Sequence, residues 1–445
     1  MSAEPPVSDQ MREDWNRRAR EDANYYVAFG RREQTDDEFF ETAKEVVAGL
    51  EWELRRLGAG NPRARRALEI GCGPGRLLKP MSRDFGEIHG VDVSDEMIRL
   101  AREKLRGTPH AHAHATDGAS LAMFADESFE VVYSYAVFQH IPSKEVVLEY
   151  LRETHRVLKP GGIFRAQFNG LPQDFPRYDT WSGVRFRADE LMAFTRRRDF
   201  QMLALEGVDT QYMWTTWRKR EPGWRERRQS ALPDSPPVRI RRITNAHNSE
   251  PVAPQSGRYA SVSVWVVGLP DDLDLFDAAV EVDGTKARAT YIGPPDAQGL
   301  QQVNAILPAG IRTGLLPVRL TWFGRPISRD AALRVIPAGP QVPRIIALSD
   351  GINLLAGTRI ETGVIKATLE ELAEPSEFRA TIDDLPVDDL EIFCTDPQPR
   401  RYEVNFKTPA ALGPGRRLLR MAVGRRKFAP VPIEIAGSAI RGALP

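Results

Sequence analysis

The chain has 445 residues, with 61 Lys and Arg residues against 61 Asp and Glu residues, so its formal net charge is zero. This balance excludes a global electrostatic attraction to nucleic acid or to an anionic membrane surface. At about 150 residues per domain, the length predicts roughly three domains.

Cysteine usage and the N-terminal sequence predict the compartment. Cys72 and Cys394 are far apart in the sequence, which argues against a disulfide framework and favours a reducing compartment. The first residues lack the basic and apolar blocks of a signal peptide, and no apolar run is long enough to span a bilayer. We therefore expect a cytoplasmic protein that does not associate with membranes.

Residues 1–60 are predicted to form an N-terminal helical cap, because apolar residues from Phe39 to Leu54 recur at spacings of three and four. From residue 61 to 220, short apolar runs alternate with helical stretches, which is typical of a parallel sheet with crossover helices. Strands are expected at 67–71, 87–93, 110–116, 129–137 and 163–169, and a late antiparallel strand within 209–220.

The strand expected at 110–116 carries His110, His112 and His114 at alternate positions, so all three side chains point to one face. They are either a metal-ligand set or the polar face of a strand. No other Cys or His pair at ligand spacing accompanies them, which favours the strand face and predicts no metal.

After residue 236, short alternating runs separated by proline and glycine predict β-sandwiches. RIRRITN at 239 resembles RIIALSD at 344, and this repeat predicts two modules, 236–340 and 341–445. The polar, proline-rich residues 221–235 are predicted to be a linker. Basic residues around Trp224 would alternatively suit single-stranded nucleic acid, but Glu221 and Glu226 dilute their charge.

The sequence ALEIGCGPGRLL contains the strongest signal for a ligand site. Gly71, Gly73 and Gly75 follow an apolar strand and precede a helix, where glycines let the backbone approach a ligand closely. Dinucleotide-binding loops occupy the same place, but here the third glycine comes one residue early. Glu69, at the end of the strand, would repel a pyrophosphate and attract a cationic cofactor.

The next predicted strand ends at Asp92, where a carboxylate can accept hydrogen bonds from both hydroxyls of a ribose. A helix cap is the alternative role for Asp92, although Ser94 suits that role better. Met97 is placed either against an adenine or in the core.

The ordered motifs LEIGCGPG, VDVSDEMI, ATDG, ESFEVVYSYAVFQHI and HRVLKPGGIF, within residues 63–218, resemble those of class I S-adenosylmethionine-dependent methyltransferases. The resemblance implies an α/β Rossmann-like domain with a seven-stranded, mostly parallel sheet, in which the strand expected at 110–116 is the edge strand. It also implies that S-adenosyl-L-methionine is bound through its methionine part by Glu69, Gly71 and Gly73, through its ribose by Asp92, and at its adenine by Asp117 and Gly118. Cys72, Gly75, Val93, Met97 and Tyr133 complete the expected cofactor-binding set.

Methyl transfer from a sulfonium is an in-line displacement that needs alignment and, for some acceptors, removal of a proton. His140, after the fourth strand, is the candidate base, with Tyr135 as a second candidate. His140 alternatively orients the loop before Pro142. Aromatic residues of the N-terminal cap, such as Trp15 and Tyr25, either cover the cofactor or only pack on the domain.

The sequence therefore predicts a methyltransferase that modifies an O or N atom of a small-molecule or glycan-linked acceptor. The β modules resemble immunoglobulin-like domains of the IPT/TIG type, which would dock substrate or a protein or carbohydrate partner. One alternative is a cofactor-binding scaffold without turnover. Another is a nucleic-acid methyltransferase, which the missing N-P-P-Y type motif disfavours; a dehydrogenase is disfavoured most.

Overall fold

The computed structural model describes residues 6–58, 60–172, 177–228 and 237–437. The contacts divide the chain into two compact units. Residues 1–20 and 40–339 form the first unit, and residues 21–39 and 340–445 form the second. No helix in the described ranges is long and apolar enough to cross a membrane.

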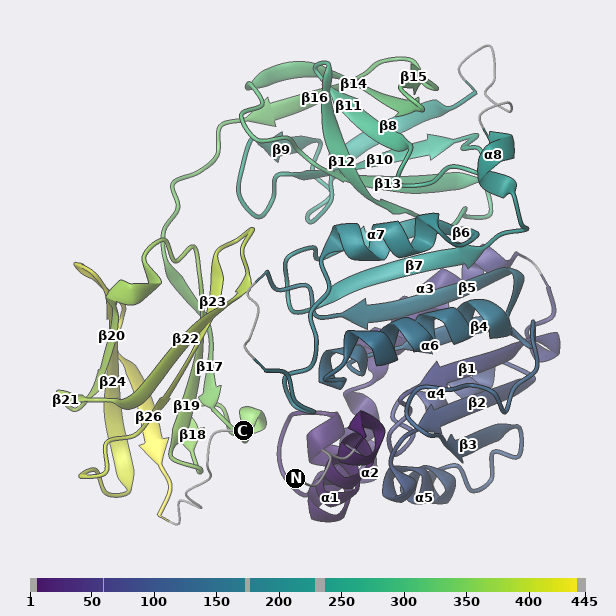
Figure 1. The fold of residues 1–445 in the computed structure, drawn as a ribbon. Coiled ribbons are helices and arrows are strands. Elements are labelled where there is room, and N and C mark those ends of the chain that lie inside the picture. Colours follow the sequence, from purple (N-terminus) through teal and green to yellow (C-terminus); the bar gives the residue numbers. More distant parts are fainter. Residues whose placement is uncertain (1–5, 59, 173–176, 229–236, 438–445) are drawn as a thin grey trace. The chain divides into compact units, whose positions relative to one another are not determined.

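The first unit contains the predicted mostly parallel sheet, in the order β3-β2-β1-β4-β5-β7-β6 (Figure 1). The pairs from β3 to β5 are parallel, whereas β7 is antiparallel to both β5 and β6. β3, which carries the histidines, is the edge strand, as predicted. The strands are β1 (Arg66–Ile70), β2 (Glu87–Asp92), β3 (Ala111–Ala115), β4 (Phe129–Ser134), β5 (Leu158–Phe168), β6 (Phe200–Glu206) and β7 (Met213–Lys219).

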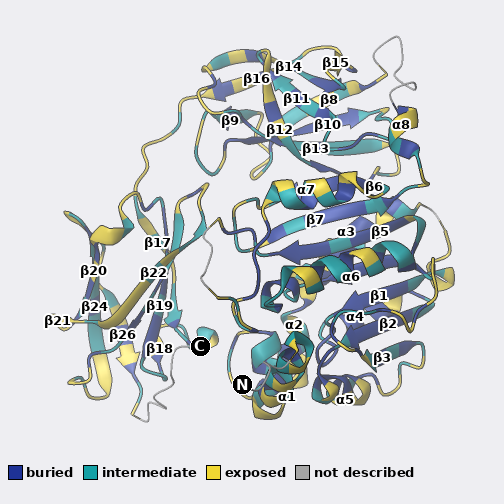
Figure 2. Ribbon diagram, in the orientation of Figure 1, coloured by how far each residue is buried: buried dark blue, intermediate teal, exposed yellow. Residues whose placement is uncertain are grey.

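Helices cover both faces of this sheet, and Figure 2 shows its strands as largely buried. One apolar cluster includes Val47 of α3 and Leu78 of α4, and a second includes Val147 and Leu151 of α6. Ser94 and Ser143 cap α5 and α6 by accepting hydrogen bonds from the third following amide. The helices are α1 (Val7–Val27), α2 (Asp36–Glu41), α3 (Lys44–Leu54), α4 (Leu78–Met81), α5 (Asp95–Lys104), α6 (Lys144–Val157), α7 (Ala188–Arg196) and α8 (Trp224–Arg228).

The first β module lies in the same unit and has its own apolar core, which includes Val264, Val303 and Trp322. A β-bridge between Tyr291 of β12 and Ala204 joins it to β6, and the Leu275 amide donates to the Met202 carbonyl at 3.1 Å. Its strands are β8 (Arg239–Asn245), β9 (Val252–Pro254), β10 (Ser261–Val267), β11 (Ala278–Val282), β12 (Thr285–Ile292), β13 (Leu300–Ile306), β14 (Gly314–Trp322), β15 (Arg325–Pro326) and β16 (Ala331–Ile336).

The second β module has two sheets, ordered β17-β19-β23-β22 and β18-β26-β24-β20-β21. The repeated sequences RIRRITN and RIIALSD form corresponding strands, β8 and β17. The immunoglobulin-like identity of the modules stays a prediction. The strands are β17 (Arg344–Asp350), β18 (Arg359–Ile360), β19 (Val364–Glu370), β20 (Phe378–Ile382), β21 (Leu385–Pro386), β22 (Asp388–Asp396), β23 (Arg401–Lys407), β24 (Gly415–Val423), β25 (Arg426–Lys427) and β26 (Val431–Ile435).

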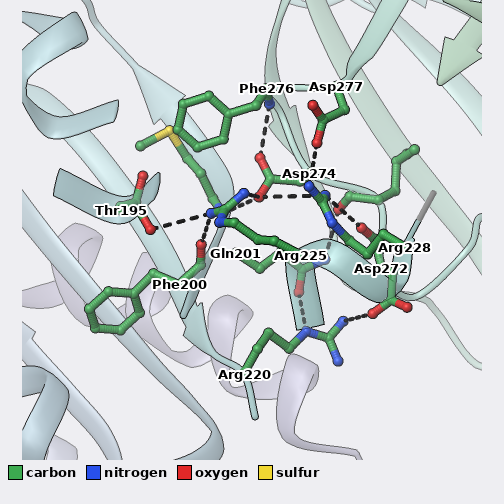
Figure 3. A network of polar contacts seen from close by, with 12 residues as sticks. Thr195, Phe200, Gln201, Arg220, Arg225, Arg228, Asp272, Asp274, Phe276 and Asp277 are labelled. Atoms are coloured by element: carbon green, nitrogen blue, oxygen red, sulfur yellow. Dashed lines mark hydrogen bonds and ion pairs between the residues drawn. The ribbon is translucent and has the colours of Figure 1, made fainter. Parts of the chain in front are cut away.

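The first part of the expected linker is folded and partly buried, and is not a solvated chain. Residues 224–228 form α8, in which Trp224 and Arg228 are only 4% and 3% exposed. Arg225 and Arg228 extend toward Asp274 and Asp277 of the first β module (Figure 3). The acidic partners lie about 50 residues away in the sequence, so local composition gives no sign of them. The remaining linker residues, 229–236, lie outside the described ranges.

The expected N-terminal cap is divided between the two units. Residues 40–58, with α3, pack in the first unit, where Trp52 Nε1 donates to the Tyr291 hydroxyl at 2.7 Å. Residues 21–39 belong to the second unit, where Tyr25 is buried against Ile352 and Val364. The backbone of α1 leaves helical geometry at Asp22, close to this division.

Candidate functional site

The glycine loop follows β1 and turns sharply at Gly71. The φ angle of Gly71 is +73°, and a Cβ there would lie 2.3 Å from Val137 Cγ2. Only glycine fits this position without strain. The amides of Gly71 and Cys72 donate to the Val91 carbonyl at 2.8 and 3.0 Å, which ties the loop to β2.

Asp92 lies at the carboxyl end of β2 and faces the glycine loop. Its Oδ2 accepts from the Gly73 amide at 2.9 Å, and its Oδ1 accepts from the Ser94 amide at 2.9 Å. Burial raises the pKa of Asp92, and these amide hydrogen bonds act in the opposite direction. The structure thus brings together two of the predicted cofactor-binding segments, the loop and the end of β2.

Glu69 and Tyr133 lie side by side on neighbouring strands beneath the loop. Glu69 is 3% exposed, and the Tyr133 hydroxyl donates to its Oε2 at 3.1 Å. Burial raises the pKa of Glu69 well above its usual range. Such a carboxyl group ionises readily only when a cation is placed beside it, so the pair suits an ammonium group.

Asp117 and Gly118 follow β3, but only Gly118 is buried. Asp117 is exposed, and its Oδ1 accepts from the amides of Ala119 and Ser120 at 3.0 and 2.8 Å, which closes its own turn. A Cβ on Gly118 would lie 3.1 Å from Val93 Cγ2 and 3.6 Å from Ser8 Cβ. The side chain of Asp117 is therefore engaged locally, while Gly118 and Val93 pack beneath α1.

Of the remaining predicted cofactor residues, Cys72, Gly75 and Met97 are buried. Cys72 and Met97 are 2% and 1% exposed, and burial raises the pKa of the Cys72 thiol well above its usual range. A neutral, buried thiol is unreactive. The Met97 amide donates to the Ser94 hydroxyl at 3.1 Å, so Met97 belongs to the first turn of α5.

The N-terminal part of α1 covers the carboxyl ends of β2 and β3. Asn16 Oδ1 accepts from the Ser94 hydroxyl at 2.7 Å and from the Glu96 amide at 3.1 Å. Arg12 donates to the Thr116 carbonyl at 3.4 Å. Sequence reasoning expected an N-terminal cap but missed Asn16, because a polar residue on a helix gives no sign of a partner so far along the chain.

His140 is held by hydrogen bonds on both ring nitrogens. Nδ1 lies 2.8 Å from the Trp181 carbonyl, so it carries the hydrogen, and Nε2 lies 3.2 Å from the Gln139 side-chain nitrogen. The ring also packs edge-on against Trp15. Burial lowers the pKa of His140 to about 4. This neutral ring orients its loop, and its predicted role as a base stays a prediction.

Gln167, which sequence reasoning missed, supports the backbone of this loop. The residue is fully buried, and its Oε1 accepts from the amide of Ala136 at 3.0 Å. Ala136 has a φ of +56°, a left-handed conformation that costs a residue with a side chain about 1 kcal/mol or more. Gln167 Nε2 also donates to Gln139 Oε1 at 3.1 Å. Gln167 therefore holds the segment that carries Tyr135 and His140.

The histidines of β3 interact with β2 and with the segment before it. His114 Nε2 lies 3.1 Å from His89 Nδ1, while His89 Nε2 lies 2.9 Å from Glu87 Oε1. His110 Nε2 lies 2.9 Å from the Ser82 carbonyl, and His112 lies 3.8 Å from Glu87. Among the residues that the structure describes, no three His, Cys, Asp or Glu side chains form a group that would hold a metal.

Comparison with known proteins identifies the domain that contains this site. Residues 68–166 match the family model described as "Methyltransferase domain". The ubiquinone biosynthesis O-methyltransferase of Ruegeria pomeroyi is 38% identical over 112 residues, which cover 24% of this chain and 43% of that protein. The trans-aconitate 2-methyltransferase of Rhodopseudomonas palustris is 31% identical over 149 residues, which cover 33% of this chain and 49% of that protein. The chain thus spans less than half the length of each of these relatives.

Solved structures also align with part of the chain. The magnesium protoporphyrin IX methyltransferase from Synechocystis with bound SAH covers 48% of this chain and 100% of its own, with 16% identity and a TM-score of 0.37.

Proposed function

Because residues 68–166 form a methyltransferase domain, we propose that this protein is an S-adenosylmethionine-dependent methyltransferase that modifies an O or N atom of a small-molecule or glycan-linked acceptor. The main structural support for this proposal is the hydrogen bond from the Gly73 amide to Asp92, which joins the glycine loop to the end of β2. The relatives named above, both methyltransferases, support the same activity.

In this proposal Glu69, with Tyr133 beside it, receives the ammonium group of the methionine part. Gly71, Gly73 and Gly75 let the backbone approach the cofactor, and Asp92 binds the ribose. Gly118, Val93 and Met97 surround the adenine, and Asp117 fixes the turn that presents them. The bound cofactor supplies an electrophilic methyl group, and the protein aligns the acceptor and excludes water.

The two β modules have different roles in this proposal. The first module packs on the catalytic domain through α8 and acts as a structural support. The second module, which forms a separate unit with residues 21–39, docks the substrate or a protein or carbohydrate partner. Both modules are assigned to the immunoglobulin-like class because of their alternating strands and internal repeat.

The test is methylation of a host extract with labelled S-adenosylmethionine, followed by mass identification of the products. We expect a labelled small molecule or glycan with the full-length protein and none with Asp92→Ala. Labelled nucleic acid would refute the proposed acceptor class. Cofactor binding without any labelled product would favour the scaffold alternative.

A further inference from the structure

Arg76, the residue directly after the glycine loop, is fixed by uncharged partners. Its Nε donates to the Thr42 hydroxyl at 2.9 Å, and its Nη2 donates to the Thr42 carbonyl. Its guanidinium carbon lies 5.5 Å from the centroid of the Tyr135 ring. The side chain is therefore held in one place at the carboxyl edge of the sheet.

Other buried arginines nearby are neutralised by carboxylates. Arg56 pairs with Glu53 at 2.7 Å, and Arg165 lies 3.5 Å from Glu206. Within the described part of the chain, by contrast, no carboxylate forms an ion pair with Arg76. A partly buried cation without a counter-ion is incompletely solvated, and an anionic ligand would relieve that cost.

The nearest carboxyl group supplies little compensation. Glu69 is close enough to act on the pKa of Arg76, but its own carboxyl group is hydrogen-bonded to Tyr133. Burial raises the pKa of Glu69 well above its usual range, which disfavours its charged form. While Glu69 holds its proton, Arg76 thus presents a positive charge that no ion pair with a described residue balances.

Aromatic rings hold Arg76 and extend toward solvent. The Tyr135 ring stacks on Trp214 with a centroid distance of 5.3 Å and an interplanar angle of 5°, and Arg165 lies 4.8 Å from the Trp214 centroid. Tyr212, whose phenol also acts on the pKa of Arg76, is 48% exposed. The stacked rings of Tyr135 and Trp214 are both half-buried.

We propose that Arg76 binds a carboxylate of the methyl acceptor, so that the enzyme prefers acceptors bearing an acid group; this inference rests on the proposed function. One guanidinium matches a carboxylate in charge and geometry. A phosphate carries up to two charges, which one guanidinium balances only in part. Tyr135, which contacts Arg76, and Trp214, which stacks on Tyr135, are not among the residues assigned to the cofactor. We therefore assign the anion to the second substrate rather than to the carboxylate of the cofactor.

The test measures binding to the full-length protein, with and without saturating S-adenosylhomocysteine. The probes are benzoate, cinnamate and succinate, each compared with its amide by ligand-observed NMR. The variants are Arg76→Gln, Arg76→Lys and the control Lys79→Gln, an exposed residue of α4 whose loss changes the charge equally. Calorimetry with S-adenosylhomocysteine measures cofactor affinity for each variant.

We expect at least one acid to bind the wild type about 10- to 100-fold more tightly than its amide, as charge-assisted hydrogen bonds predict. Arg76→Gln should abolish this preference, Arg76→Lys should reduce it, and Lys79→Gln should keep it. Affinity for S-adenosylhomocysteine should change by less than about threefold in every variant.

Three results would overturn the proposal. One is that no acid binds better than its amide, and another is that Arg76→Gln keeps the preference. The third is that Arg76→Gln weakens S-adenosylhomocysteine binding tenfold or more, which would assign Arg76 to the cofactor carboxylate. Failure of the wild type to bind S-adenosylhomocysteine would instead refute the proposed function, while the probes tested without it would still decide the role of Arg76.

Discussion

The carboxylate of Asp92 accepts a hydrogen bond from the Gly73 amide at 2.9 Å. This contact joins two segments that are 19 residues apart and places a carboxylate oxygen beside the glycine loop. Because the second oxygen of Asp92 accepts from the Ser94 amide, the carboxylate also fixes the start of α5. One residue thus organises both the loop and the helix that follows β2.

Asp92→Ala should weaken S-adenosylhomocysteine binding by about 10- to 100-fold, because it removes the hydrogen bonds that we propose Asp92 makes to the ribose and frees the Gly73 amide. Titration calorimetry measures the affinity. Asp95→Ala, which removes an exposed acid from the same region, is the control and should bind normally. Equal affinities in the two variants would refute the ribose assignment.

Gly71→Ala should destabilise the fold by about 1–3 kcal/mol, because it places a side chain at a positive φ and against Val137. Urea unfolding measures the loss. The double variant Gly71→Ala with Val137→Ala should recover only the part due to the clash, since the backbone strain remains. A Gly71→Ala protein as stable as the wild type would contradict the loop geometry.

S-adenosylhomocysteine binding should release a proton from Glu69. Burial raises the pKa of this carboxyl group, and the ligand's ammonium lowers it again by favouring the charged form. Affinity should therefore rise with pH while the free protein still holds this proton. Calorimetry in buffers of different ionisation enthalpy detects the release, and Glu69→Gln should abolish it. Identical heats in all buffers for the wild type would argue against this coupling.

The free energy of unfolding of His155→Leu should fall less on acidification than that of the wild type. Burial lowers the pKa of His155 to about 4, below its ordinary value of about 6.5 in an unfolded chain. The unfolded state therefore binds a proton first, and the folded state loses stability as the pH falls from about 6.5 toward 4.

The free energy of unfolding of the leucine variant, relative to that of the wild type, should be about 1 kcal/mol higher at pH 5 than at pH 7.5. This value allows for solvent screening. Urea unfolding of the two proteins at both pH values measures it. An advantage that is the same at both pH values would show that His155 does not titrate differently in the two states.

Asp274→Ala should weaken the contact between α8 and the first β module. Asp274 is fully buried, lies 3.3 Å from Arg225 and accepts from the Phe276 amide at 2.9 Å (Figure 3). Its removal leaves Arg225 without its carboxylate, whereas Arg228 keeps Asp277 at 2.5 Å. The loss of this buried carboxylate should cost about 3–5 kcal/mol of unfolding free energy.

Asp272→Ala is the matched control for this interface, because Asp272 is 43% exposed and lies 3.3 Å from Arg220. We expect a loss below about 1 kcal/mol for this partly exposed pair. Chemical unfolding followed by tryptophan fluorescence measures both variants. Similar losses in the two variants would show that Asp274 is not the main contact.

Much of the site was predicted from the sequence because its signals are local. Gly71 and Gly73 follow an apolar strand directly, and Asp92 ends the next one. The carboxyl ends of adjacent parallel strands meet at one edge of a sheet, so strand order alone brings these residues together. The edge position of β3 follows from the same strand order.

The sequence by itself determined the glycine loop, the cap at Ser94, the parallel strands on either side of that loop and the change to β modules, because periodicity, glycine and capping residues act over a few neighbouring positions. Only the tertiary structure decided that Asn16 reaches Ser94, that Arg225 meets Asp274, and that residues 21–39 belong with the second β module. It also decided that Arg76 lacks a carboxylate among the described residues. These relationships join side chains from distant segments, and packing selects such pairs without leaving a local pattern in the sequence.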